Sequence, residues 1–165
     1  MTEAQASRRW VASDVMTREV VAVEPTTPVA QILAAFRRHS IGGVLVVDHG
    51  RLAGIVTEGD ILARIARDAP HLDYASYFAL TLPTMLYPGD DATLAERLEG
   101  LRRLTARDIM TARVVTVTAD TPVTEVARQL MKHRIKRVPV VDAGKVVGVV
   151  ARGDIVRRIG ALDEA

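Results

Sequence analysis

The chain has 165 residues, which is enough for one domain or two small ones. Hydrophobic residues make up 48% and charged residues 25%, an ordinary balance for a soluble globular protein. There is no cysteine, which excludes disulfides, thiolate metal sites and thiol catalysis. No apolar run approaches the roughly 18–20 residues that cross a bilayer, and the first ten residues hold no signal core, so no membrane contact and a cytoplasmic location are expected.

The net charge of +2 is distributed unevenly along the chain. Residues 1–100 carry 9 Lys/Arg and 13 Asp/Glu, whereas residues 101–165 carry 13 and 7. An anionic partner would therefore meet the second half first. A solvated basic face is the simpler interpretation of charge alone.

The sequence contains an internal repeat. Residues 12–66 align with residues 106–160 at a constant offset of 94, without a gap, and 24 of the 55 positions are identical. Such agreement is not expected by chance, so the chain holds two copies of one repeat. Residues 1–11 and 161–165 are expected to be tails.

Each copy is predicted to open with a short helical turn and a strand. The turns are "SDVM" and "RDIM", and the strands are "EVVAV" and "RVVTV". Thr27-Pro28 and Thr121-Pro122 then predict an N-cap followed by proline at the first helical position. The apolar residues that share one face of each helix are Val29, Ile32, Leu33 and Phe36 in the first copy, and Val123, Val126, Ala127 and Leu130 in the second.

Two strands and a second helix complete each copy. The strands are joined by turns at His49-Gly50 and Ala143-Gly144. The fold class is therefore α/β (α+β), with two β-α-β-β-α repeats. A unit of about 55 residues buries too little surface to be secure alone. We expect the repeats to pack with pseudo-twofold symmetry around a ligand cleft between the sheets.

Residues 67–105 do not repeat and form a connecting segment. Residues 92–104 are predicted to form an amphipathic helix with Leu94, Leu98 and Leu101 on one side. The segment is too apolar for a loose linker, so it is expected to fold over the module or to supply a partner surface.

The phrases "DVMT…VVAV…TPV" and "VLVVD-HG-RLAGIVTEGD", with their second copies, resemble the CBS domain, named after cystathionine β-synthase. The tandem resembles a CBS pair, or Bateman module, over about 110 of the 165 residues. The resemblance implies a free-standing regulatory protein and not an enzyme. It also implies binding of an adenine nucleotide (AMP, ADP, ATP or S-adenosylmethionine) and a homodimer, with no further cofactor.

Asp60 and Asp154 each follow a glycine at the start of a helix. The structural interpretation is a helix cap near the positive end of the dipole. The resemblance assigns them to ribose binding, since an ionised carboxylate offers two acceptor oxygens to a vicinal diol. The resemblance also implies that Thr57 gives a hydroxyl to ribose or phosphate. Ala151, its counterpart, cannot do so, which makes the two sites unequal.

Basic residues are concentrated in the second copy, where the first has Ser40, Gly42 and Gly43. They are either a solvated helix end or a phosphate clamp. The four are Arg134, Lys136, Arg137 and Arg152. The resemblance also suggests, more weakly, an adenine pocket at Val21, Val115, Gly43 and Pro139. No histidines stand at metal-ligand spacing, and no metal site is predicted.

The sequence therefore predicts a cytoplasmic sensor whose ligand state is transmitted to a regulated protein that remains unknown. Two alternatives stay open. One is a ligand-free dimerisation module, and the other is a nucleic-acid-binding protein that uses the basic second repeat. The second lacks aromatic residues interleaved with its charge, which argues against nucleic acid as a partner.

Overall fold

The computed structural model describes residues 10–67 and 98–161. They form two compact units, and the two units do not follow the sequence repeats. Of the described residues, the first-repeat unit contains 22–47, 53–67 and 98–112, and the second-repeat unit contains 10–21, 48–52 and 113–161. The fold is mixed α+β, as the sequence predicts.

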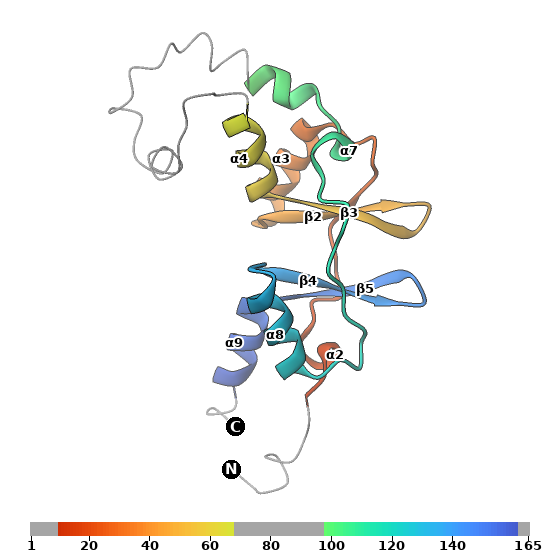
Figure 1. Ribbon diagram of the computed structural model, residues 1–165, viewed down its shortest axis with the longest axis vertical. Helices are drawn as coiled ribbons and strands as arrows, with labels where there is room; N and C mark the ends of the chain where they lie inside the picture. Colours follow the sequence, from red (N-terminus) through yellow and green to blue (C-terminus); the bar gives the residue numbers. More distant parts are fainter. Residues whose placement is uncertain (1–9, 68–97, 162–165) are drawn as a thin grey trace, which may run out of the picture. The chain divides into compact units, whose positions relative to one another are not determined.

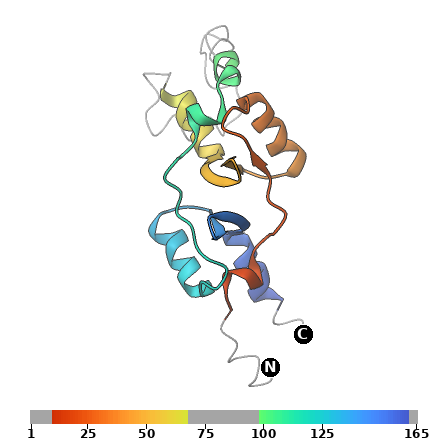
Figure 2. The ribbon, with the colours of Figure 1, turned by 90° about the vertical axis from the view of Figure 1, so that its right-hand side faces the viewer.

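The first-repeat unit is built on a three-stranded sheet in the order β1-β2-β3. Strand β1 (Ala22–Val23) runs parallel to β2 (Gly43–Asp48), and β3 (Arg51–Thr57) follows a tight turn. Helices α3 (Val29–His39) and α4 (Glu58–Arg67) lie on one face of the β2–β3 hairpin in both views (Figures 1 and 2). Val29 and Ile32 are fully buried in this unit, whereas Leu33 and Phe36 are half-buried.

The second-repeat unit repeats this arrangement. Strands β4 (Arg137–Asp142) and β5 (Lys145–Ala151) form an antiparallel hairpin that α8 (Val123–Lys132) and α9 (Arg152–Gly160) cover on one face (Figure 1). Where the first unit has β1, the second has a single parallel bridge between Val117 and Val140. Its core consists of Ala12, Val117, Val126, Leu130, Val138, Val140 and Val150.

The opening segments, residues 11–17 and 105–111, pack on the other repeat. Helix α2 (Ala12–Val15) joins the second-repeat unit, where Ala12 N–H donates to the carbonyl of Thr121 at 2.8 Å. Helix α7 (Ala106–Ile109) joins the first-repeat unit, where Ala106 N–H donates to Thr27 at the same distance. In Figure 2 the red α2 accordingly lies beside the blue α9. Each sequence repeat therefore completes the core of its neighbour.

The predicted hairpin turns are correct, whereas the predicted helix starts are not. His49 and Gly50 have φ values of 47° and 79°, and Ala143 and Gly144 match them at 46° and 80°. Two successive positive φ values fit the strand twist, so the predicted hairpin turns are confirmed. The predicted N-caps are wrong by one residue, because Pro28 and Pro122 occupy the cap position.

The hydroxyl of Thr27 explains this shift. It accepts a hydrogen bond from the N–H of Glu24 at 3.1 Å and so stabilises the preceding turn instead of the helix. The predicted strands at 19–23 and 113–117 shorten to β1 and to the Val117 bridge. Of the predicted helix at 92–104, residues 98–103 are helical and Leu101 is buried, while Leu94 lies outside the described residues.

Candidate ribose-binding carboxylates

The Asp60 carboxylate, in the first turn of α4, accepts three hydrogen bonds. The backbone N–H and the hydroxyl of Thr57 donate to Oδ2 at 2.7 and 2.6 Å. The hydroxyl of Thr111 donates to Oδ1 at 2.9 Å. The first bond is the one that an N3 carboxylate makes in a capping box, and together the two bonds fix the orientation of the carboxylate.

Thr111 reaches Asp60 because its opening segment pairs with β3. Thr111 and Ile55 exchange two backbone hydrogen bonds, at 2.9 and 3.1 Å. Glycine at position 54 permits this approach, since an added Cβ would lie 2.7 Å from Sδ of Met110. Thr111 is not among the residues predicted for the site, although the threonine of "DIMT" recurs in both copies.

The Asp154 carboxylate has the same place in α9 but different partners. Its Oδ2 accepts the N–H of Ala151 at 2.7 Å, which reproduces the backbone bond between Thr57 and Asp60. Its Oδ1 pairs with Nη2 of Arg157, one turn along the helix. The Asp154 side chain is only 9% exposed, whereas that of Arg157 is 75% exposed. Arg157 was also missed, because nothing in the repeat pattern marks it.

Three predicted basic residues are brought together near Asp154. Arg152 donates its N–H to the carbonyl of Lys136 and its Nε to the carbonyl of Ile135, both at 3.0 Å. Arg137 opens β4 directly opposite Ala151. These contacts place three cationic residues around the start of α9. Arg134 is exposed just beyond the end of α8, with a positive φ of 53°.

The matching corner of the first repeat carries the opposite charge. Glu58 occupies the position of Arg152, and its N–H donates to the carbonyl of Gly42 at 3.3 Å. A Cβ at Gly42 would lie 2.7 Å from the Glu58 carboxylate, so glycine makes room for that side chain. The two carboxylates therefore lie in different electrostatic surroundings.

The four residues predicted for an adenine pocket lie mostly within the packed units. Gly43 is buried at the start of β2, and Val21 is half-buried. Val115 packs against the core of the second-repeat unit. Pro139 is fully buried, and its carbonyl accepts the N–H of Val117 at 3.1 Å. Their role in binding adenine stays a prediction.

Within residues 10–67 and 98–161, no group of three or more His, Asp or Glu side chains is placed to hold a metal ion. In that same part of the chain, every helix is too short or too polar to span a membrane.

The fold and the paired aspartates define a tandem β-α-β-β-α module. The chain belongs to the CBS domain family, whose model matches residues 12–67 and 106–161. An uncharacterized protein of Methanocaldococcus jannaschii is 29% identical over 153 residues, which cover 88% of this chain and 89% of that protein. This chain covers only 31% of a second uncharacterized protein of that organism, at 28% identity.

Two solved structures with adenosine-type ligands are similar to this chain. The CBS domain pair of protein MJ0100, in complex with 5′-methylthioadenosine and S-adenosyl-L-methionine, has a TM-score of 0.66 and 25% identity, covering 94% of this chain and 99% of that one. The complex of CBSX2 with AMP has a TM-score of 0.68 and 25% identity, covering 93% and 98%. A chloroplastic CBSX2 is known from Arabidopsis thaliana.

Proposed function

We propose that this protein is a regulatory sensor that binds an adenine nucleotide or an S-adenosyl derivative, with Asp60 and Asp154 accepting the ribose hydroxyls. One observation carries the proposal. In both repeats the aspartate Oδ2 accepts a backbone N–H at 2.7 Å, three residues before it, which holds the carboxylate at a helix start. CBS pairs of similar fold hold AMP, S-adenosyl-L-methionine or methylthioadenosine.

Binding of a diol requires a rearrangement at Asp60. A carboxylate has about four acceptor positions, and Asp60 already uses three of them. The Thr111 hydroxyl can rotate away and free Oδ1, so that the carboxylate can accept both ribose hydroxyls. The Thr57 hydroxyl is then near the ligand, where it contacts ribose or phosphate.

In the second repeat, the phosphates are proposed to contact the basic residues around the start of α9. Arginine offers bidentate donors to phosphate, and charge-assisted hydrogen bonds are stronger than neutral ones. These residues are Lys136, Arg137 and Arg152, and Arg134, just beyond the end of α8, is proposed to act with them. Adenine is proposed to lie against Val21, Val115, Gly43 and Pro139, through apolar and backbone contacts.

The sensor is proposed to act in the cytoplasm as a homodimer that transmits its ligand state to a regulated protein, without catalysis of its own. Three exposed apolar side chains of the second-repeat unit, Met131 on α8 and Val156 and Ile159 on α9, support burial against a second copy. Light scattering should give about twice the 17.9 kDa of one chain, and a monomer at micromolar concentration would contradict the dimer.

A thermal-shift screen of AMP, ADP, ATP, S-adenosylmethionine and NADH tests the ligand class. A ligand at 100 times its dissociation constant should stabilise the fold by about 2.7 kcal/mol. In calorimetry, Asp60→Ala should remove binding at the first-repeat site, and Asp154→Ala should remove binding at the second-repeat site. If both variants fold and bind every adenine ligand like wild type, the aspartates are only helix caps.

The nucleic-acid alternative is tested by gel shift at about 150 mM salt. Binding through charge alone should be no tighter than about 10⁻⁴–10⁻⁶ M, because salt screens it. Nanomolar, sequence-dependent binding would contradict the sensor proposal.

A further inference from the structure

The two carboxylates differ most in the group that occupies Oδ1. At Asp60 that group is the neutral hydroxyl of Thr111. At Asp154 it is the guanidinium of Arg157, and the position that matches Arg157 in the first repeat is Ala63. Asp154 uses two of its about four acceptor positions, so a ribose diol that binds it lies beside a cation of the protein itself.

This guanidinium lies close to the helix start. Its Nη1 lies 3.3 Å from the position that a Cβ on Gly153 would occupy, so the side chain folds back over the first turn of α9. The N-terminal end of a helix favours anions, and the arginine adds a full positive charge there. A ligand that brings an anionic group gives Arg157 a second anionic partner beside Asp154.

We propose that Arg157 is a specificity-determining residue that makes the second repeat select a phosphate-bearing nucleotide over the uncharged nucleoside. This rests on the proposed function. Adenosine offers the Arg157 guanidinium no anion, whereas a 5′-phosphate can accept its hydrogen bonds. The first repeat, with Ala63 and Thr111, has no such requirement and discriminates less between the two ligands.

The only tryptophan of the chain provides a local readout. Trp10 belongs to the second-repeat unit, and the guanidinium carbon of Arg158 on α9 lies 5.1 Å from the centre of its ring. Its fluorescence therefore follows the helix that carries Asp154 and Arg157. Titrations with adenosine and with AMP give the selectivity ratio of the second repeat, and calorimetry gives total binding.

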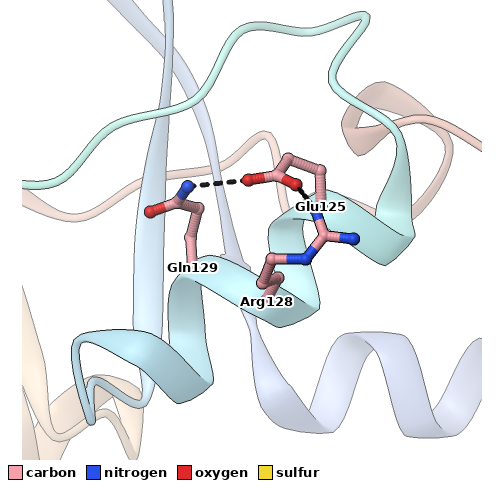
Figure 3. Close-up of polar contacts among 3 residues, drawn as sticks. All are labelled: Glu125, Arg128 and Gln129. Carbon is pink, nitrogen blue, oxygen red and sulfur yellow. Dashed lines mark hydrogen bonds and ion pairs between the residues drawn. The ribbon is translucent and has the colours of Figure 1, made fainter.

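The test compares Arg157→Ala with Arg128→Ala. Arg128 pairs with Glu125 on α8 of the same unit, again three residues apart (Figure 3). Arg157→Ala should leave adenosine binding within about 2-fold of wild type, because adenosine carries no anion for the guanidinium to contact. It should weaken AMP binding by about 10-fold through loss of a charge-assisted bond. Arg128→Ala should leave the ratio unchanged.

A gain-of-function variant tests the same idea in the first repeat. Ala63 is exposed on α4, three residues after Asp60. In an Asp154→Ala background, Ala63→Arg should raise the AMP-to-adenosine ratio measured by calorimetry. An unchanged ratio in Arg157→Ala, or an equal fall in Arg128→Ala, overturns the role of Arg157 while the ribose assignment stands. Absence of all adenine binding in wild type overturns the proposed function as well.

Discussion

Thr111 and Asp60 are 51 residues apart and belong to different sequence repeats, yet the threonine hydroxyl donates to Oδ1 of the aspartate at 2.9 Å. The contact exists because the opening segment at 105–111 completes the first-repeat unit. The candidate site of one repeat is therefore fixed in part by the other.

Thr111→Val should lower the free energy of unfolding by about 0.5–1.5 kcal/mol, the usual contribution of one hydrogen bond. Urea denaturation measures the change. Thr17→Val is the matched control, because Thr17 pairs with Val149 through its backbone alone among the described residues. Equal losses in the two variants would show that the hydroxyl bond to Asp60 adds nothing.

Substitution can add a hydroxyl at position 151 in the second repeat, or remove the matching hydroxyl at position 57 in the first. Ala151→Thr should add a second donor to Oδ2 of Asp154 and raise the free energy of unfolding by up to about 1 kcal/mol. The backbone supports this, because the N–H bonds at 57 and 151 to the following aspartates are both 2.7 Å long. Thr57→Ala should have the opposite effect. Destabilisation by Ala151→Thr would contradict the equivalence of the two helix starts.

Gly148→Ala should detach the opening segment at 11–17 from the second-repeat unit. The added Cβ would lie 2.5 Å from Sδ of Met16 and 3.0 Å from the carbonyl oxygen of Thr17. Overpacking of this kind costs about 1–3 kcal/mol. Gly100→Ala is the control, since nothing lies within 4 Å of its Cβ and alanine favours a helix by about 0.5–1 kcal/mol. Hydrogen exchange at Thr17 should accelerate only in Gly148→Ala.

Stability should depend on pH through Asp108. The N–H and then the hydroxyl of Thr105, both 2.7 Å from Oδ2, lower the pKa of this carboxyl. A lowered pKa in the folded state gives stability that is present above the ordinary aspartate pKa of about 3.9 and is lost as pH falls toward the folded value. The stabilities of wild type and Asp108→Asn in urea denaturation should thus differ at pH 7, by under about 1 kcal/mol, and the difference should be smaller at pH 3. A difference that is the same at both pH values would contradict this assignment.

The order of elements could be predicted because each is marked locally. Apolar spacing marks α3 and α8, and the glycines at 50 and 144 mark the hairpin turns. The exchange of opening segments could not be predicted, since "DVMT" and "DIMT" present almost the same side chains to either repeat. Only the three-dimensional path of the chain decides which hairpin each segment meets.

The candidate site could likewise be predicted only in part. Asp60 and Asp154 are recognisable because they recur at the same place in each copy. Thr111 reaches Asp60 only across the exchanged segment, and Arg157 has no counterpart in the first repeat. Alignment of the two copies identifies the residues that they share. It does not identify Thr111 and Arg157, the residues that give the two carboxylates different contacts.

The central claim is that the two aspartates accept ribose hydroxyls. Calorimetry with AMP and with 2′,3′-dideoxy-AMP tests it most directly, because the second ligand keeps the adenine and the phosphate but lacks both donors. We expect AMP to bind at least about 10-fold more tightly in wild type, since two hydrogen bonds to a charged group are lost. The difference should shrink in Asp60→Ala and in Asp154→Ala. Equal affinity of the two ligands for wild type would contradict the claim.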